Sequence, residues 1–555
     1  MRLSGSDILV RTLIEQGCTT VFGYPGGQIL DVYDSLYKYG DEIKHVLTAH
    51  EQGAAHAADG YARTTGEVGV VISTSGPGAT NLVTGIATAY LDSVPMVAVC
   101  GNVPTTQIGT DSFQEIDITG ITLPITKHNY FVSDVSDLAD VIREAFCLAK
   151  SGRPGPVLID IPKDVQSAVG EYFPSEKVSK AEPFAAKDIR IDEAAACINS
   201  SERPCIYFGG GVLASDATDE LIQLADKLDS PIACSMMGLS VLPTNHPRFL
   251  GMEGMHGRYS ASKVMCMADC IIALGVRFSD RATGNVEKFA QSAKVVHIDI
   301  DGSELSKNVM ASHGLRGDIK ETLKKLLPLL NKKELLQWQK EINAVKIAET
   351  ELADNRSGLT PANVLKRLNK RLTANTAVAT DVGQHQLWAA QSLKFDSSRR
   401  FLTSGGLGTM GYGLGAAIGA AYGTGERSVL ITGDGSFGMN LNELATAVSY
   451  NVPLVVLIMN NGALGMVRQW QKLFFDKRYS QSTLDRKTDF VQVAKAFGAD
   501  GCAVFTEEEL ENALDSAFAS NCVYVIDCAV DKDELVMPML VPGGSLDEII
   551  VKEGK

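Results

Sequence analysis

Short apolar runs rich in β-branched residues alternate with helix-length segments along most of this chain. Examples are "VGVVIST" at 68–74, "GPVLIDIP" at 155–162, "CIIALGV" at 270–276 and "SVLITGDG" at 428–435. Runs of this kind are typical of strands buried on both faces of a sheet, and parallel strands need a long connection, usually a helix. The alternation therefore predicts an α/β protein built on parallel sheets.

The chain is too long for one hydrophobic core, since 555 residues fit three domains of ordinary size. Two stretches break the alternation and predict linkers, at 166–190 and 336–358, the second of which contains charged helices. The predicted organisation is three consecutive α/β domains at 1–165, 191–335 and 359–535, followed by a C-terminal tail at 536–555.

Composition argues against nucleic acid and membranes as partners. Lys and Arg total 51 and Asp and Glu total 66, so the net charge is −15, and no basic stretch is interleaved with aromatic residues. No apolar run approaches membrane-spanning length, and the N-terminus lacks the pattern of a signal peptide. The 11 cysteines are scattered without a CxxC motif, and only Cys266 and Cys270 are close in sequence. We therefore expect reduced thiols and a cytoplasmic protein.

One predicted strand is followed directly by the turn Gly433, Asp434 and Gly435. In a parallel sheet, ligands gather outside the carboxyl ends of the strands, and the amides that open the next helix can bind a diphosphate. Asp434 offers a carboxylate oxygen of the kind that Mg²⁺ or Ca²⁺ prefers. Asn461, at the end of the next strand, and the carbonyl of Ala463 are candidate further ligands. The competing interpretation is that Asp434 only caps a helix.

This "GDG" followed by "NN" resembles the diphosphate motif of thiamin-diphosphate enzymes. Those enzymes have a pyrimidine-binding, a central FAD-type and a diphosphate-binding domain, in the order of the three predicted here. The resemblance places Glu51, in "HVLTAHEQGAAHAADGYAR", against the pyrimidine ring. A carboxylic acid there favours the ring tautomer that removes the thiazolium proton. Without the resemblance, Glu51 would be interpreted as a surface acid.

Longer motifs resemble one branch of that superfamily. "VFGYPGG" at 21–27, "TSGPGATNLVTGIATAY" at 74–90, "RFLTSGGLGTMGYGLG" at 400–415 and "GMVRQWQKLFF" at 465–475 are similar to acetohydroxyacid synthases, also called acetolactate synthases. The resemblance implies that pyruvate is decarboxylated on thiamin diphosphate. The two-carbon unit would then join a second pyruvate, giving 2-acetolactate, or 2-ketobutyrate, giving 2-aceto-2-hydroxybutyrate, in branched-chain amino-acid biosynthesis.

The resemblance also assigns individual residues. Gln384 and His385 would hold the diphosphate, with Met410 beneath the bent cofactor and Met466 beside the pyrimidine. The other assigned thiamin-diphosphate residues are Gly26, Gly383, Gly408, Gly433, Gly435 and Ser436. The assigned Mg²⁺ ligands are Asp434, Asn461 and Ala463, and the assigned catalytic residues are Glu51, Phe113, Gln114, Lys127, Trp470 and Arg281.

Two of these residues bear on the choice of second substrate. Trp470 matches the tryptophan that favours 2-ketobutyrate in the family, and discrimination of one methylene is worth about 1–3 kcal/mol. Arg281 matches an arginine expected near the carboxylate of the second keto acid, which guanidinium geometry suits. From the residues alone, an ion pair between Arg281 and an acid such as Asp280 is the simpler interpretation.

The central domain carries a flavin-like pattern. "FGGGV" at 208–212 resembles the glycine loop that approaches the FAD diphosphate, and 251–257 and 297–301 resemble other segments that line FAD. In acetohydroxyacid synthases this FAD has no redox role in the main reaction. The residues assigned to it are Gly209, Gly210, Gly211, His256 and Asp299.

Two alternative functions stay open. An FAD-dependent pyruvate oxidase, or another thiamin carboligase, shares the superfamily, and pyruvate oxidases use their flavin for redox chemistry. A non-catalytic thiamin-diphosphate-binding protein is the alternative from another class. The "RQWQ" stretch around Trp470 argues against the first, and Glu51 together with the predicted metal ligands argues against the second.

Five positions depart from the family pattern: Gln28, Leu123, Glu253, Ser279 and Gly415. Leu123 and Ser279 replace residues expected near the flavin, which leaves open whether FAD is bound. Gln28 lies close to the expected active site and leaves the second-substrate preference open. None of the five belongs to the predicted thiamin-diphosphate or metal site.

The resemblance finally implies an assembly. The cofactor site would be shared between two subunits, with Glu51 from one and Asp434 from the other, so we expect a homodimer or a higher oligomer. A separate small regulatory subunit is also expected.

Overall fold

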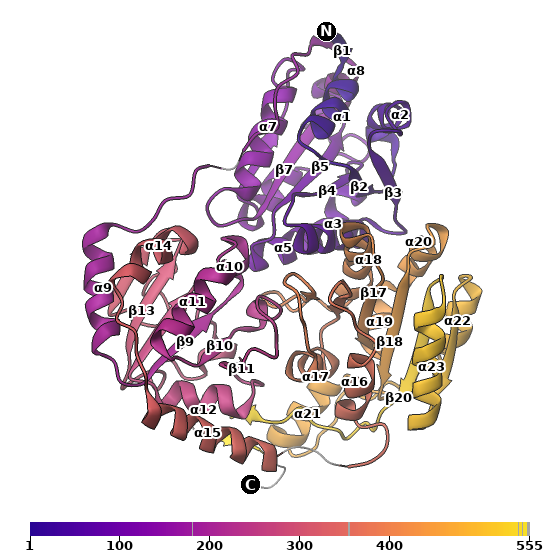
Figure 1. Cartoon of the computed structure of the whole chain (residues 1–555). Coiled ribbons are helices and arrows are strands. Elements are labelled where there is room, and N and C mark those ends of the chain that lie inside the picture. Colours follow the sequence, from indigo (N-terminus) through magenta and orange to yellow (C-terminus); the bar gives the residue numbers. More distant parts are fainter. Residues whose placement is uncertain (180, 353–355, 542, 547, 552–555) are drawn as a thin grey trace. The chain divides into compact units, whose positions relative to one another are not determined.

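The computed structural model describes residues 1–179, 181–352, 356–541, 543–546 and 548–551. Within these residues lie three six-stranded sheets whose strands are connected largely through helices (Figure 1). One sheet falls in each predicted domain. The predicted fold class, three consecutive α/β domains with parallel sheets, is therefore confirmed.

The chain forms two compact units. Unit 1 comprises residues 1–181, 375–385 and 402–532, and unit 2 comprises residues 182–374, 386–401 and 533–555. The first and third predicted domains therefore share one unit, while most of the predicted C-terminal tail belongs to the unit of the central domain. The predicted boundaries within each unit stay predictions.

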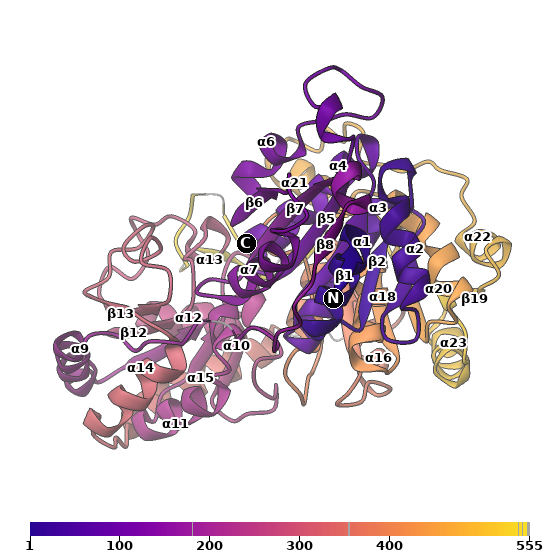
Figure 2. The ribbon, with the colours of Figure 1, turned by 90° about the horizontal axis from the view of Figure 1, so that it is seen from above.

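The first sheet, in unit 1, has the order β3-β2-β4-β5-β7-β6, and its neighbouring strands run parallel. Figure 2 shows β5 and β7 side by side. The strands are β2 (Thr20–Gly23), β3 (Lys44–Leu47), β4 (Gly69–Ser73), β5 (Met96–Asn102), β6 (His128–Phe131) and β7 (Pro156–Pro162).

Helices cover both faces of this sheet. Apolar side chains of α1 (Gly5–Glu15), α2 (Leu30–Lys38) and α7 (Leu138–Lys150) pack on one face, and those of α3 (Glu51–Thr65) and α5 (Val83–Asp92) pack on the other. Shorter helices in this part are α4 (Pro77–Asn81), α6 (Ile118–Thr122) and α8 (Lys163–Ser167). In addition, β1 (Arg2–Ser4) pairs with β8 (Val169–Glu171), so the predicted linker at 166–190 begins inside unit 1.

The third sheet, also in unit 1, has the order β16-β15-β17-β18-β20-β19, and the strands from β15 to β19 in this order run parallel. The strands are β15 (Ala377–Thr380), β16 (Phe401–Leu402), β17 (Ser428–Gly433), β18 (Leu454–Asn460), β19 (Asp500–Val504) and β20 (Tyr524–Ala529). The helices are α18 (Tyr412–Thr424), α19 (Asp434–Asn440), α20 (Leu444–Ser449), α21 (Gly465–Phe474), α22 (Phe490–Ala496) and α23 (Glu507–Ala519), whereas α17 (Gln384–Ser392) begins in unit 1 and belongs mostly to unit 2.

Helices α3 and α18 pack closely within unit 1 (Figure 1). A Cβ atom added to Gly419 would overlap the carbonyl oxygen of Ala57, and one added to Gly415 would lie 2.7 Å from the carbonyl oxygen of Gly53. Because only glycine leaves room for the facing backbone, these residues set the spacing of the two helices. Gly415, one of the five positions that depart from the family pattern, therefore lies in the contact between these two helices.

The second sheet, in unit 2, has the order β11-β10-β9-β12-β13-β14, with parallel neighbours throughout. The strands are β9 (Pro204–Phe208), β10 (Ile232–Cys234), β11 (Phe249–Met252), β12 (Cys270–Leu274), β13 (Lys294–Asp299) and β14 (His313–Arg316). One face is covered by α9 (Asp188–Ser200), α11 (Thr218–Leu228) and α14 (Ile319–Leu326), and the other by α12 (Tyr259–Met267) and α15 (Leu336–Glu351).

The remaining elements of unit 2 are short or lie in the predicted linker and tail. They are α10 (Gly210–Ala214), α13 (Asp280–Thr283), α16 (Pro361–Asn369), β21 (Met539–Leu540) and β22 (Ile549–Ile550). The charged helix expected in the linker at 336–358 is α15, whose buried Trp338 donates from Nε1 to the carbonyl of Pro204 (3.0 Å). Of the helices that the structure describes, none combines the length and the apolar character needed to cross a membrane.

Candidate active site

Asp434 lies where two neighbouring parallel strands end. It is the first residue of α19, directly after β17, and the register of β17 with β18 places Gly433 opposite Met459. The carboxyl group is 6% exposed, and its Oδ1 atom has no hydrogen-bond partner. Burial raises the pKa of this carboxyl to about 6, while the backbone N–H groups of Asp434, Asn461 and Gly435 oppose that shift.

The helix-cap interpretation of Asp434 is not supported. The N-cap of α19 is Gly433, and no side chain caps this helix by a hydrogen bond. A buried carboxylate oxygen without a partner costs free energy unless something binds it. The geometry therefore favours the metal-ligand interpretation.

Asn461 connects this turn to the end of β15. Its Nδ2 donates to Oε1 of Gln384 (3.2 Å), and Nε2 of Gln384 donates to Oε1 of Gln469 (3.0 Å). The Oδ1 atom of Asn461 accepts from the backbone N–H of Ala463 (3.1 Å), which leaves a second lone pair. A carboxylate oxygen, an amide oxygen and a nearby backbone carbonyl are the donor types that Mg²⁺ prefers, so these residues fit that ion.

His385 and two glycines surround the same turn. The imidazole of His385 is buried and its Nε2 has no partner. Burial lowers the pKa of His385 to about 3, so the ring is neutral. A Cβ atom on Gly433 would lie 2.9 Å from Nδ1 of His385, and one on Gly465 would overlap Oε1 of Gln384. This crowded, side-chain-free backbone with an unsatisfied ring nitrogen fits a bound diphosphate.

Asp381 is a residue of this site that sequence reasoning missed. Its buried carboxylate, just after β15, accepts from the Gly413 N–H (2.8 Å) and from Oγ1 of Thr432 (2.7 Å). Burial raises its pKa, and donors from Gly413, Thr432, Gly411 and Ser436 oppose the shift. Asp381 therefore ties the start of α18 to the Asp434 turn. An acid directly after an apolar strand, the signal that drew attention to Asp434, was present here too.

The loop before α18 brings Met410 to the turn. The Gly408 and Gly411 backbones have φ angles of +71° and +86°, which favour glycine, and the Gly411 N–H donates to Oγ of Ser436 (3.3 Å). The Cε atom of Met410 lies 3.9 Å from the Cβ position of Gly435. Of the predicted residues assigned to this site, Met410, Gly435 and Ser436 are thus brought together.

Met466 and Trp470 lie on α21, which follows Asn461 and Ala463 in the chain. The Trp470 ring contacts Phe474 edge to face, with 5.4 Å between ring centroids. Their predicted roles toward the pyrimidine and the second substrate stay predictions.

Glu51 begins α3 in a second cluster of unit 1. It is 8% exposed, and its Oε2 accepts from Nδ2 of Asn81 (2.9 Å). The surface-acid interpretation is therefore not supported. Beside it, the buried Glu443 accepts from the backbone N–H of His50 (2.9 Å) and of Ala49 (3.1 Å). Burial, with a smaller contribution from the charge of Glu51, raises the pKa of Glu443.

Two glycines allow close approach near this Glu51 cluster. A Cβ atom on Gly26 would lie 2.5 Å from Cβ of Thr74, and one on Gly76 would lie 2.9 Å from the carbonyl oxygen of Gln114. Gln114 itself adopts a φ of +64°. The preceding Phe113 is 83% exposed, so this chain by itself does not enclose its ring. Its predicted contact with the thiazolium needs a further subunit or ligand that covers it.

Gln28 lies near the Glu51 cluster of unit 1, whereas Lys127 lies apart from both clusters. The backbone N–H of Gln28 donates to Oγ1 of Thr74 (3.3 Å), which places it at the Glu51 end of the sheet. Lys127 donates from Nζ to the carbonyls of Leu148 and Ser151 (2.6 Å to the latter), at the C-terminus of α7. Burial lowers the pKa of Lys127 to about 8. These contacts give Lys127 a role in holding α7, and neither cluster includes it.

The flavin-like segments meet at the carboxyl edge of the second sheet. The backbone N–H groups of Gly209 and Gly211 donate to the carbonyls of Leu274 (3.0 Å) and Gly275 (3.3 Å). A Cβ atom on Gly211 would lie 2.6 Å from Cα of Gly275. The glycines of this loop are therefore explained first by packing against the loop after β12, and Gly210 begins the short helix α10.

Two buried groups after β11 lack partners. Both carboxyl oxygens of Glu253 and the Nδ1 atom of His256 have no hydrogen-bond partner. Burial raises the pKa of Glu253 to about 8 and lowers that of His256 to about 4, so both are neutral at pH 7. Asp299, at the end of β13, accepts from the backbone N–H of Asp301 (2.9 Å). Unsatisfied buried groups at a carboxyl edge fit a polar ligand such as FAD.

Arg281 and Ser279 lie in the turn that forms α13. The Arg281 guanidinium is 3.7 Å from the Asp280 carboxylate and donates to the sulfur of Met255 (3.4 Å). Ser279 is the N-cap residue of α13. The ion pair with Asp280 that the residues suggest is therefore present, with a long separation. The predicted contact of Arg281 with a keto acid stays a prediction.

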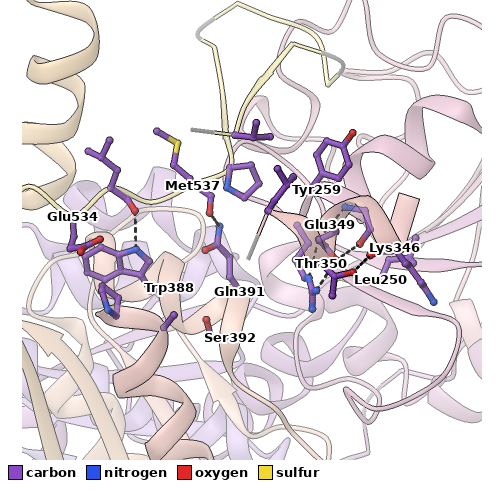
Figure 3. Close-up of a pocket in the computed structure, with 18 of the residues that line it drawn as sticks. Leu250, Tyr259, Lys346, Glu349, Thr350, Trp388, Gln391, Ser392, Glu534 and Met537 are labelled. Carbon is purple, nitrogen blue, oxygen red and sulfur yellow. Dashed lines mark hydrogen bonds and ion pairs between the residues drawn. The ribbon is translucent and has the colours of Figure 1, made fainter. Parts of the chain in front are cut away.

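A cavity of 980 Å³ lies in unit 2 and contains none of the predicted site residues (Figure 3). Its walls come from α12, α15, α17 and the chain after residue 533. The Glu349 carboxylate accepts from Arg258 (2.7 Å) and from Oγ of Ser260 (2.9 Å), and Nζ of Lys346 donates to a backbone carbonyl. These lining charges are matched within the wall, so nothing among the described residues identifies a ligand for this cavity.

Three family models match the chain. They describe the N-terminal TPP binding domain, the central domain and the C-terminal TPP binding domain of thiamine pyrophosphate enzymes, and they match residues 3–121, 191–326 and 381–528. The chain is therefore a thiamine pyrophosphate enzyme by class, with the Glu51 and Asp434 clusters in its two TPP binding domains.

Full-length relatives narrow this class. The acetolactate synthase isozyme 3 and isozyme 2 large subunits of Escherichia coli K12 are each 43% identical over 99% of this chain, covering 98% and 100% of their own lengths. A probable acetolactate synthase large subunit of Methanocaldococcus jannaschii is 44% identical over 99% of this chain and 95% of its own length. The chain belongs to the acetolactate synthase large-subunit family.

Proposed function

We propose that this chain is the catalytic large subunit of an acetolactate synthase in branched-chain amino-acid biosynthesis. It decarboxylates pyruvate and joins the two-carbon unit to a second pyruvate, giving 2-acetolactate, or to 2-ketobutyrate, giving 2-aceto-2-hydroxybutyrate. The full-length similarity to acetolactate synthase large subunits supports the reaction class. The observation that carries the cofactor site is the buried, unpartnered Oδ1 of Asp434 beside Asn461.

Thiamin diphosphate, when bound, supplies the nucleophilic carbon and the electron sink that decarboxylation of a 2-keto acid requires. Asp434, the amide oxygen of Asn461 and the carbonyl of Ala463 bind Mg²⁺. The diphosphate is held by residues around the same turn: Gly383, Gln384, His385, Gly408, Gly433, Gly435 and Ser436. Met410 and Met466 supply apolar contacts to the cofactor, and Gly26 admits it at the Glu51 cluster.

Glu51 holds and moves one proton at the pyrimidine ring. The Asn81 amide occupies its Oε2, which leaves Oε1 to face the ring nitrogen. Low exposure excludes water that would compete for this hydrogen bond. Phe113 and Gln114 close the site over the reacting carbon.

The proposal includes a homodimer or higher oligomer. In one chain, Glu51 contacts Asn81 and lies beside Glu443, whereas Asp434 contacts its own turn and Asn461. The two carboxylates thus belong to different clusters. A second copy that presents its Asp434 cluster to Glu51 gives a complete site, with Phe113 covered by the assembly. The large-subunit names of the relatives support a small regulatory subunit as a further partner.

Specificity and the second cofactor complete the proposal. Trp470 narrows the pocket for the second keto acid, Arg281 binds its carboxylate, and Gln28 adjusts the preference between pyruvate and 2-ketobutyrate. FAD binds without a redox role at the carboxyl edge of the second sheet, next to Gly209, Gly210, Gly211, His256 and Asp299. The unsatisfied Nδ1 of His256 and the buried Glu253 support a polar ligand there.

A product assay tests this function. Purified protein with Mg²⁺, thiamin diphosphate and FAD receives pyruvate alone and then pyruvate with 2-ketobutyrate. We expect 2-acetolactate in the first case and mainly 2-aceto-2-hydroxybutyrate in the second, with turnover lowered about 10²–10⁴-fold in Glu51→Gln. Glu42→Gln, which changes an exposed acid paired with Arg11, serves as the matched control.

Other products would reject the proposal. Acetate or acetyl phosphate with peroxide would indicate a pyruvate oxidase. Release of CO₂ without any acetohydroxy acid would indicate a different carboligase, and no CO₂ from pyruvate would indicate a protein that only binds thiamin diphosphate.

A further inference from the structure

The loop at 403–411, which carries Met410, contacts the C-terminus of α5 within unit 1. The Asp92 carboxylate accepts from the backbone N–H of Gly406 through Oδ1 (2.7 Å) and from that of Gly405 through Oδ2 (3.0 Å). Asp92 is the last residue of α5, and no part of its side chain is exposed. One carboxylate from a helix of the first sheet thus binds two consecutive N–H groups of the loop.

A second contact with the loop lies one turn earlier on α5. The hydroxyls of Thr88 and Thr409 are 2.7 Å apart, and both residues are buried. Because the Thr88 hydroxyl donates its hydrogen to the carbonyl of Thr84 (2.8 Å), it accepts from Thr409. Residues four apart lie on the same face of a helix, so Thr88 and Asp92 together form one face of α5 that binds the loop. Thr409 directly precedes Met410.

A buried arginine matches the charge of Asp92. Arg63 on α3 donates from Nη2 to Oδ2 of Asp92 (2.8 Å) and also pairs with the buried Asp59, one turn earlier on α3. The hydroxyl of Tyr412, the first residue of α18, donates to Oδ1 of Asp59 (2.6 Å). These four residues, called the Arg63 cluster, connect three helices with the loop.

Asp92 occupies a position that is unfavourable for an acid without such partners. The dipole of α5 disfavours a negative charge at the helix C-terminus, and a buried carboxylate costs free energy unless donors bind it. Arg63 and the two loop N–H groups supply donors. In return, the loop is bound by a charged acceptor at Gly405 and Gly406, where it has no side chains that could order it.

We propose that Asp92 is a positioning residue of the reaction, because it holds the loop that places Met410 against the cofactor. The inference rests on the proposed function, in which Met410 contacts thiamin diphosphate. The Cε atom of Met410 lies 3.9 Å from the Cβ position of Gly435, in the turn proposed to bind the diphosphate. Asp92 and Thr88 hold the two ends of the segment that precedes Met410, so the loss of either contact loosens that segment.

Hydrogen exchange and cofactor binding of the full chain test this inference. An amide has one acceptor oxygen where a carboxylate has two, so in Asp92→Asn at least one N–H of Gly405 and Gly406 loses its acceptor. We expect backbone exchange in the peptide that contains 403–411 to become about 10-fold faster, because hydrogen bonds to charged groups are the stronger ones. The dissociation constant of thiamin diphosphate, measured by calorimetry with Mg²⁺, should also rise about 10-fold.

Two further variants separate positioning from a purely structural role. Asp59→Asn weakens the same Arg63 cluster through the contacts of Asp59 with Arg63 and Tyr412. It should lower the thermal unfolding midpoint and leave loop exchange and cofactor affinity close to those of the parent. Thr88→Val removes the second contact with the loop and no charge, so it should change both quantities in the same direction as Asp92→Asn, by a smaller factor. It keeps the test valid if Asp92→Asn does not fold.

Two results would overturn the inference. One is that loop exchange and cofactor affinity in folded Asp92→Asn match the parent. The other is that Asp59→Asn, at a similar loss of thermal stability, weakens cofactor binding as much as Asp92→Asn, which would make Asp92 a structural residue. Neither measurement depends on turnover, so a parent chain that binds thiamin diphosphate without forming an acetohydroxy acid would reject the proposed function alone.

Discussion

Asp434 and Glu253 are both buried acids that follow a strand at the carboxyl edge of a parallel sheet, one in each unit. Burial raises the pKa of Asp434 to about 6 and that of Glu253 to about 8. Backbone N–H groups of Asp434, Gly435 and Asn461 oppose the shift at the first site, whereas neither carboxyl oxygen of Glu253 has a hydrogen-bond partner at the second.

The difference shows how a fold prepares an acid for one protonation state. The pKa of Asp434 is raised less, so this acid ionises more readily and offers an unpartnered oxygen to a cation, while Glu253 keeps its proton more readily and is less suited to a metal. Burial alone therefore does not prepare an acid to bind a cation. The backbone donors of the turn after β17 are what distinguish the two edges.

The largest expected effect comes from removing the charge of Asp434. In Asp434→Asn, the affinity for Mg²⁺ in the presence of thiamin diphosphate should fall by more than about 100-fold, because the charged ligand among the proposed Mg²⁺ ligands loses its charge. Calorimetric titration with Mg²⁺ measures this. Asp500→Asn, on the edge strand β19, is the control. An unchanged affinity would remove Asp434 from the metal site and make the two edges equivalent.

The second prediction concerns Asp381, which positions the Asp434 turn. Asp381→Asn turns an acceptor toward the Gly411 and Gly413 N–H groups into a partial donor, so the dissociation constant of thiamin diphosphate should rise about 10–100-fold. Turnover at saturating cofactor should change far less. Thr432→Val removes a single donor and should have a smaller effect. If turnover falls and cofactor affinity does not, Asp381 is not a positioning residue.

A smaller effect is expected from Trp470, which lies on α21, the helix after β18. Trp470→Leu should lower the ratio of 2-aceto-2-hydroxybutyrate to 2-acetolactate by about tenfold, since one methylene is worth about 1–3 kcal/mol. Competition between pyruvate and 2-ketobutyrate measures the ratio. Phe474→Leu removes the ring that packs against Trp470 and should leave the ratio nearly unchanged. Equal ratios in parent and Trp470→Leu would assign the preference to other residues.

The last prediction concerns stability at the other edge. The pKa of Glu253 is about 8 in the folded state and 4.5 is its ordinary value, so the folded state binds the proton more tightly. The stabilisation that this proton gives the folded state is complete below pH 4.5 and is lost as pH rises toward 8. Between pH 4.5 and 7 the loss is about 3 kcal/mol. The stability of Glu253→Gln relative to the parent chain should therefore increase as pH rises.

Thermal unfolding midpoints of the parent and Glu253→Gln at pH 5, 6, 7 and 8 test this. The difference between the two proteins should grow with pH and level off above pH 8. A difference that does not vary with pH would mean that Glu253 has an ordinary pKa, and the contrast with Asp434 would then rest on geometry alone.

Much of the candidate site could be proposed from the sequence because its residues are close together in local motifs. Gly433, Asp434 and Gly435 are adjacent in the chain, and the end of β18 puts Asn461 beside them through a register that parallel strands impose. Asp381 was missed because its partners, Gly413 and Thr432, come from separate elements. Lys127 was assigned by resemblance, and its contacts with the carbonyls of Leu148 and Ser151 depend on how α7 packs.

The cysteines show the same limit. Sequence spacing drew attention to Cys266 and Cys270, whereas the fold places Cys270 in the same core as the distant Cys197 and places Cys266 beside the core on the other face of the sheet. Spacing along a helix or strand is set by local geometry, but the approach of α9 to the second sheet is set by burial of its apolar face.

By itself, the sequence determined the three parallel sheets, the positions of the acids and glycines at strand ends, and the family. These follow from periodicity and from short motifs, which operate over a few residues. The tertiary structure alone decided that the first and third sheets share one unit, that Glu51 and Asp434 lie in different clusters, and how strongly burial raises the pKa of each buried acid. Those properties depend on long-range packing and on the donors it brings to each carboxylate, and neither is written in any local pattern.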